Sequence, residues 1–205
     1  MTARTRSRLV AAAAAFSLAA SLAACSDGAG ADPRSTVVQT SSAATTTTEH
    51  DDADVTFAQM MIVHHEGAIE MAELAAATAS TPQVRALAAR IAAAQGPQID
   101  RMKRWLDGWG EPQPADVEHG GMDHGGMSMD GTDQAGAMSD LRGLSGTEFD
   151  RRFLELMTAH HQGAVTMSEE ELASGRNAEA LALARSIIDD QTAEITEMTN
   201  LLHGL

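Results

Sequence analysis

The chain repeats itself at an offset of 96 residues, and this repeat limits its fold more than any other feature. Residues 57–73 match 153–169, and residues 87–106 match 183–202, with no gap in either alignment. The identical positions follow the three-to-four-residue spacing of a helix face. Each copy is long enough for two helices joined by a turn. We therefore expect two helical hairpins that pack as a four-helix bundle.

Composition favours the same all-α class. The 205 residues suit about one domain, and 43% hydrophobic residues can supply its core. Aromatic residues, which favour strands, make up only 3% of the chain, whereas helix-forming Ala and Met are plentiful. A large multidomain enzyme is excluded.

Local signals place the helices near 52–79, 82–107, 148–174 and 178–203. Helix starts are indicated by the acidic residues 51–54, by Thr81 with Pro82, by a capping box of Thr147 and Asp150, and by Asn177. Helix ends are indicated by Gly108, Gly110 and Gly175.

Histidine and methionine recur together on the first helix of each copy. Two adjacent His fall on or near the face that should meet the bundle interior, and Met lies one turn away. The candidate metal ligands are Met61, His64, His65 and Met71 in the first copy and Met157, His160, His161 and Met167 in the second. Core packing alone is the alternative for the Met residues. Because buried imidazoles need polar partners, we interpret the repeated pairs as metal ligands.

Two further kinds of residue accompany this pattern. Gln95 and Gln191 lie within apolar stripes, where they either orient ligands or hydrogen-bond a neighbouring helix. Met102 and Met198 are weaker ligand candidates. Thioether and imidazole ligands favour Cu(I), with Cu(II) also accepted by His and carboxylate.

The segment 111–146, rich in Gly, Pro, Asp and Met, predicts a long loop that joins the hairpins and is too broken for a helix. Within it His and Met alternate with Gly, which leaves their side chains free to gather round an ion. The candidate ligands there are His119, Met122, His124 and Met127. A polar linker in which His and Met occur by chance is the alternative.

The N-terminus has the pattern of a secretory signal. Residues 1–24 combine three Arg with an Ala-rich apolar run, and Leu22-Ala23-Ala24-Cys25 resembles a bacterial lipobox. We expect Cys25 to be lipid-modified and residues 25–50 to be a flexible tether, which places the protein on the extracytoplasmic face of the cell membrane. An ordinary cleaved signal is the alternative. Since Cys25 is the sole cysteine, the folded part can have no internal disulfide.

Charge narrows the choice of partners. The net charge of −15 leaves no basic surface for phosphates, so nucleic acid is excluded as a partner. The partners we expect are a copper ion, the membrane through the lipid anchor, and a copper-handling protein.

The segments 60–72 and 157–167 resemble the duplicated signature of the bacterial domain-of-unknown-function family 305. That resemblance implies a ferritin-like, extracytoplasmic four-helix protein associated with copper binding. It also implies that the eight His and Met residues named above on the helices are ligands. The second copy departs from the first in having Leu156 at the place of Met60 and Gln162 at that of Glu66.

Three functions compete. The first is a copper-binding lipoprotein that sequesters or transfers copper. The second is a ferritin-like di-iron oxidoreductase, which needs a Glu-x-x-His motif that we do not find on these helices. The third is a helical surface protein that binds a partner without metal. No nucleophile or catalytic triad is evident, so we expect no enzyme activity.

Overall fold

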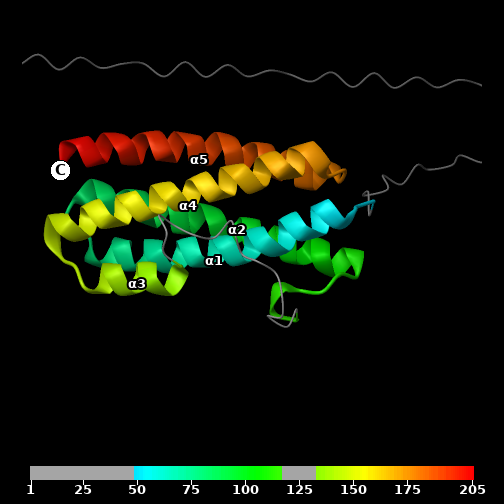
Figure 1. Ribbon diagram of the computed structural model, residues 1–205, viewed down its shortest axis with the longest axis horizontal. Helices are drawn as coiled ribbons and strands as arrows, with labels where there is room; N and C mark the ends of the chain where they lie inside the picture. The colour runs from blue at the N-terminus through cyan, green and yellow to red at the C-terminus, as the bar shows by residue number, and fades with distance from the viewer. Residues whose placement is uncertain (1–48, 117–132) are drawn as a thin grey trace, which may run out of the picture. The chain divides into compact units, whose positions relative to one another are not determined.

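The computed structural model describes residues 49–116 and 133–205, and in these residues the chain is helical without strands (Figure 1). The elements are α1 (Asp52–Thr78), α2 (Pro82–Trp109), the 3₁₀ helix η1 (Pro114–Asp116), α3 (Gln134–Arg142), α4 (Gly146–Ser174) and α5 (Ala178–Gly204). The all-α prediction is confirmed, and the four long helices agree with their expected ranges to within two residues. No helix in the described part is long and apolar enough to cross a membrane.

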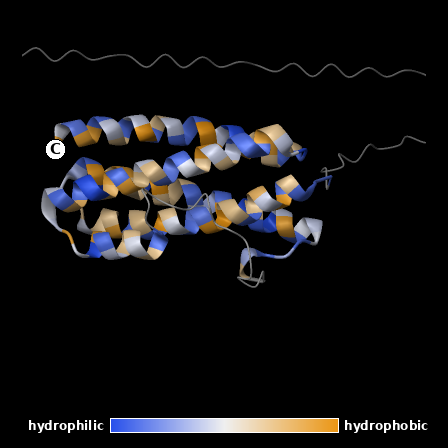
Figure 2. Ribbon diagram, viewed as in Figure 1, coloured by the Kyte–Doolittle hydropathy of each residue, from blue (hydrophilic) through white to orange (hydrophobic). Residues whose placement is uncertain are grey.

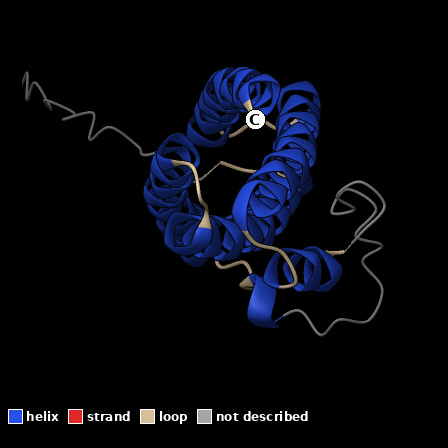
Figure 3. Cartoon of the chain, turned by 90° about the vertical axis from the view of Figure 1, so that its left-hand side faces the viewer, coloured by secondary structure: helices blue, strands red, loops and turns tan. Residues whose placement is uncertain are grey.

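The long helices form two hairpins. α1 packs along α2, α4 packs along α5, and α1 also contacts α4, so the equivalent helices of the two copies meet (Figures 1 and 3). Hydrophobic and hydrophilic residues alternate along each long helix (Figure 2). Burial of the apolar positions, rather than helix propensity alone, therefore holds the hairpins together.

Side chains cap the starts of α1 and α5, and of these two caps the one at Asn177 is the predicted one. Asp51 caps α1, where its side chain accepts from the backbone N–H groups of Ala53 and Asp54, and the Asp54 carboxylate accepts from the backbone N–H of Asp51. Asn177 caps α5 by accepting from the N–H groups of Glu179 and Ala180. These caps satisfy donors that the first turn of a helix leaves without partners.

The expected capping box at the start of α4 is wrong. α4 begins after Ser145, and Asp150 lies one turn inside the helix, where it is fully buried. Its carboxylate crosses to the α1–α2 turn and accepts from the backbone N–H groups of Ser80 and Thr81, at 2.8 Å each, and from both hydroxyls. A tertiary contact thus replaces the local cap, and the Thr81 side chain makes no capping hydrogen bond to α2.

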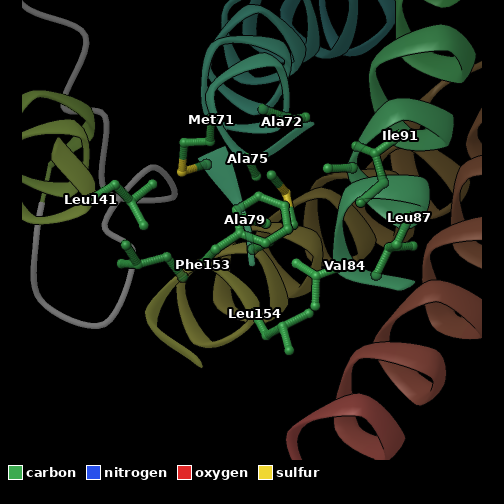
Figure 4. Close-up of a cluster of buried hydrophobic side chains, with 14 of the residues drawn as sticks. Met71, Ala72, Ala75, Ala79, Val84, Leu87, Ile91, Leu141, Phe153 and Leu154 are labelled. Atoms are coloured by element: carbon green, nitrogen blue, oxygen red, sulfur yellow. The ribbon is translucent and has the colours of Figure 1, made fainter. Parts of the chain in front are cut away.

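The expectation of an unbroken loop over 111–146 is also wrong, because α3 forms within it. Asp133 caps α3, and Ala137, Met138 and Leu141 are buried. Leu141 shares one buried cluster with Met71 of α1 and Phe153 of α4 (Figure 4). An isolated nine-residue helix is marginal in water, so this packing stabilises α3, and the local sequence alone does not reveal it.

The end of α2 also differs from the prediction. The helix continues through Gly108 to Trp109 and stops at Gly110, whose φ of 78° is left-handed. Glycine adopts that conformation without the steric cost that a Cβ would add.

Candidate metal centre

His64 of α1 and His160 of α4 lie against each other in the interior. Their ring centroids are 3.6 Å apart, with 41° between the ring planes. They are only 3% and 4% exposed. Since each occupies the same position in its copy of the repeat, the contact between α1 and α4 places the two rings together.

The other two histidines point into their own hairpins. His65 Nε2 lies 2.7 Å from Oε1 of Gln98 on α2, and His161 Nε2 lies 2.7 Å from Oε2 of Glu194 on α5. Both rings are fully buried. Gln98 and Glu194 are themselves 96 residues apart, so the two hairpins repeat the arrangement with an amide in one and a carboxylate in the other.

Sequence reasoning missed Gln98 and Glu194 because they differ in residue type. They could have been found from their spacing, because each polar residue lies 33 positions after its histidine in both copies of the repeat. A carboxylate or amide that accepts from one ring nitrogen fixes the tautomer and orients the other nitrogen, as in many metal sites.

All four histidines keep one nitrogen without a hydrogen-bond partner. The Nδ1 atoms of His64, His65, His160 and His161 are buried and unpartnered. When Nε2 of His65 or His161 donates to its oxygen acceptor, Nδ1 carries the lone pair. A buried lone pair with no donor is costly unless it meets a cation, so these atoms are suited to bind metal.

Burial keeps the imidazoles of His64, His65 and His160 neutral. Desolvation, helped by repulsion from His65 and His161, lowers the pKa of His64 to about 3. Desolvation likewise lowers the pKa of His65 to about 4, against the raising effect of its hydrogen bond to Gln98. For His160, desolvation and then the neighbouring histidines hold the pKa well below its ordinary value. Neutral imidazole is the form that binds metal.

The methionines divide between two buried clusters, and each cluster contains Met residues from both copies of the repeat. Met61 of the first copy shares a cluster with Met167 of the second, together with Met102. Met71 shares the other cluster with Met157 and Met198. Met61 and Met71 therefore belong to different clusters. A metal ion in either cluster would take its thioether ligands from both copies of the repeat.

The glutamines are buried amides without full partners. Gln95 is 3% exposed, and neither its Oε1 nor its Nε2 has a hydrogen-bond partner. Oε1 of Gln191 is also unpartnered. The expected alternative of an amide bonded to a neighbouring helix is thus not what the structure has at Gln95.

A cavity of about 270 Å³ leads to the central histidine pair. His64 and His160 line it together with Glu66, Glu70 and Gln134. Gln134 of α3 reaches over α1, where its Nε2 donates to the Gly67 carbonyl oxygen at 3.1 Å and to the Glu70 carboxylate at 3.2 Å. The two carboxylates on this approach are each ion-paired, Glu66 with Lys103 at 2.9 Å and Glu70 with Arg142 at 3.1 Å.

Gly67 is required by this arrangement. A Cβ at that position would lie 2.8 Å from Oε1 of Gln134. The absence of a side chain on α1 lets α3 approach the cavity closely.

Neither the histidines nor the carboxylates of the described residues form a ready cluster of three metal ligands. Within 49–116 and 133–205, no three or more His, Cys, Asp or Glu side chains are grouped so that they could hold a metal ion. The candidate donors are neutral imidazoles and thioethers, which suit a soft ion. The predicted loop ligands His119, Met122, His124 and Met127 lie outside the described residues, as do Cys25 and the predicted signal segment 1–24.

Comparison with known proteins gives one consistent result. The sequence profile of the Domain of unknown function (DUF305) family matches residues 54–202. A DUF305 protein from Streptomyces coelicolor that is regarded as secreted is 35% identical, with a TM-score of 0.65 over 74% of this chain and 91% of that one. A DUF305 fragment from Deinococcus radiodurans is 34% identical, with a TM-score of 0.65 over 76% of this chain and 98% of that one.

The chain is also similar to CopM. In its Cu(II)-bound form CopM is 35% identical, with a TM-score of 0.62 over 74% of this chain and 96% of that one. CopM has also been solved in Cu(I)-bound and Ag-bound forms. A comparison with curated proteins gives no match.

Proposed function

The chain belongs to the DUF305 family, and on that premise we propose that it binds copper outside the cytoplasm and sequesters or transfers it through His and Met side chains. The observation that carries this proposal is the buried His64–His160 pair, whose Nδ1 atoms have no partner. His65 and His161 add two rings oriented by Gln98 and Glu194. The conclusion of copper as cargo is supported by the softness of these donors and by the metals bound in CopM.

We propose Cu(I) as the favoured state and Cu(II) as possible. Buried, neutral imidazoles and thioethers stabilise a monovalent ion without leaving a large uncompensated charge in the interior. The sequestered ion would lie among the candidate ligands Met61, His64, His65 and Met71 and their counterparts Met157, His160, His161 and Met167. The His and Met residues predicted as ligands in the loop would add further sites.

The four long helices support the description of a ferritin-like four-helix bundle, but the donors differ from those of a di-iron oxidoreductase. Such an enzyme needs several carboxylates around its metals. The described residues contain no grouping of that kind. We therefore propose a binding protein rather than an enzyme.

The location rests on the N-terminal signal and on the secreted relative. We propose that lipid on Cys25 anchors the protein to the outer face of the cell membrane, where a copper-handling protein is a possible partner. A Cys25→Ala variant should leave the membrane fraction. If that variant stays with the membranes, the anchor is wrong while the copper proposal is untouched.

The test of copper binding is a competition titration of the full chain against a Cu(I) chelator. His64→Ala combined with His160→Ala should remove the tightest class of sites, with a loss of affinity of about tenfold or more. His203→Ala, which changes an exposed histidine at the end of α5, is the matched control and should bind like the parent. If the double variant binds copper as tightly as the parent, the His centre is refuted. If the parent itself binds no copper, the chain is better described as a helical surface protein that binds a partner without metal.

A further inference from the structure

A second cavity lies at the opposite end of the α1–α4 contact from α3. Its volume is about 430 Å³. The first turns of α1 and the last turns of α4 line it, with Phe57, Met60, Met167, Glu170, Glu171 and Ser174 among the residues. None of the four central histidines lines it, so it is separate from the His64–His160 pair, although Met167, one of the candidate ligands named above, borders it.

Glu171 is the unusual residue of this cavity. It is only 2% exposed, yet neither of its carboxylate oxygens accepts a hydrogen bond from any donor. Its neighbour is the Asp54 carboxylate, which already accepts from the N–H groups of Asp51, Arg176 and Asn177. Burial, and next a side-chain hydrogen bond to Asp54 and the negative charge of that carboxylate, raise the pKa of Glu171 to about 8, so in the metal-free protein the protonated Glu171 donates to Asp54. The Glu171 carboxyl group therefore needs a positive partner, either a proton or another cation.

The backbone makes room for this acid. A Cβ at Gly175 would overlap Oε1 of Glu171. Gly175 has a φ of −74°, which any residue can adopt, so the backbone conformation does not demand glycine there. What favours glycine at position 175 is the close approach of the Glu171 carboxyl group.

The repeat shows what is special about this end. The positions 96 residues before Glu170 and Glu171 are Leu74 and Ala75, and the counterpart of Met60 is Leu156. At that other end the equivalent surface is apolar, and Ala137, Met138 and Leu141 of α3 join its buried cluster. The two ends thus differ in chemistry. One is filled by hydrocarbon, and the other holds an open cavity with thioethers and a buried acid.

We propose that this cavity is a second site for a soft monovalent metal ion, with the Met60 and Met167 thioethers as ligands and the Glu171 carboxylate as the neutralising donor. Thioethers select Cu(I) or Ag(I) over hard cations, and the carboxylate balances the charge of the bound ion. The inference rests on the proposed function for the identity of the cargo but not on the histidine centre.

The test is an Ag(I) titration of the full chain labelled with ¹³C at the Met methyl groups, followed by NMR. Ag(I) is a redox-stable probe for Cu(I). The Met60 and Met167 signals, assigned from Met60→Leu and Met167→Leu, should both shift as this site fills. Glu171→Gln should weaken that shift by about tenfold or more in Ag(I) concentration. Glu170→Gln, a change of the adjacent acid in the same cavity, is the matched control and should titrate like the parent.

Two results would overturn the proposal. One is that the Met60 and Met167 methyl signals stay in place at saturating Ag(I). The other is that Glu171→Gln and Glu170→Gln titrate alike, which would leave Glu171 as a protonated core residue. The titration in the His64→Ala, His160→Ala background separates the two sites. If the Met60 and Met167 signals still shift in that background, Ag(I) binds this cavity without the histidine centre. If they no longer shift, the second site is wrong.

Discussion

Asp54 and Asp150 each hold the hairpin turn of the other copy of the repeat. Asp54 of the first copy accepts from the Asn177 N–H at 2.9 Å, and Asp150 of the second accepts from the Thr81 N–H at 2.8 Å. Burial raises the pKa of each carboxyl group, but these hydrogen bonds outweigh it, and both pKa values lie below the ordinary one. The two hairpins are therefore locked together by a reciprocal pair of ionised side chains.

Removing one of these locks should destabilise the fold strongly. Asp150→Ala leaves the N–H groups of Ser80 and Thr81 without their acceptor, and hydrogen bonds to a charged group contribute about 1.5–3 kcal/mol each. We expect the free energy of unfolding in urea to fall by about 3 kcal/mol. Asp189→Ala, a change of an exposed acid on α5, should alter it by less than about 0.5 kcal/mol. Similar values for the two variants would contradict the lock.

Acid should destabilise the metal-free protein before its carboxylates titrate. The pKa values of His64 and His65 are about 3 and 4 in the folded protein, against an ordinary value of 6.5. Between these limits the unfolded chain binds more protons, so stability rises with pH and is lost as the pH falls below 6.5. Each histidine should contribute a slope of about 1.4 kcal/mol per pH unit. Urea unfolding between pH 7 and pH 4.5 measures this slope, and a His64→Gln variant should have a shallower one.

A rise in pH should destabilise the metal-free protein through Glu171, whereas a fall in pH destabilises it through the histidines. The pKa of Glu171 is raised from 4.5 to about 8, so the folded protein holds a proton that the unfolded chain releases. Its contribution to stability is present below pH 4.5 and is lost as the pH rises towards 8. Glu171→Gln should therefore lose less stability than the parent between pH 5 and pH 9 when metal is absent. An unchanged profile in thermal unfolding would show that Glu171 ionises normally.

Metal binding at the histidine centre should resist acid. Because the apo pKa values of His64 and His65 are already near 3 and 4, protons compete with copper only at low pH. We expect Cu(I) affinity at the buried histidines to change little between pH 7 and pH 5, whereas any site built from imidazoles with the reference pKa of 6.5 loses affinity in that range. Chelator competition with the full chain and with a deletion of 117–132 separates the two classes. A steep loss near pH 6.5 in the deletion variant would contradict burial of the ligands.

The side chain of Gln134 should control how fast metal reaches the histidines. It lines the same cavity as His64 and His160, and within the described residues its Nε2 donates to Gly67 and Glu70. Gln134→Ala should therefore raise the association and dissociation rates of Ag(I) together, by a few-fold, and leave Kd almost unchanged. Stopped-flow measurement of Trp fluorescence can follow both rates, since Trp105 packs in the cluster that contains Met61. A change in the dissociation rate alone would identify Gln134 as part of the binding site itself.

Periodic and repeated features could be predicted from the sequence, because they depend on spacing along the chain. The 96-residue repeat indicated four long helices, and helical spacing placed His64 on an interior face and His65 at its margin. The cap at Asn177 could be predicted for the same reason, since its donors lie only two and three residues away.

Contacts between the two copies could be determined only from the tertiary structure. Whether His64 meets His160, whether Asp150 caps its own helix or reaches the Ser80–Thr81 turn, and whether 134–142 forms a helix all depend on surfaces brought together from distant segments. The repeat shows that two positions are equivalent but not whether they touch. Glu171 follows the same rule, because its burial beside Asp54 results from the packing of α4 against α1, and nothing near it in the sequence distinguishes it from the exposed Glu170.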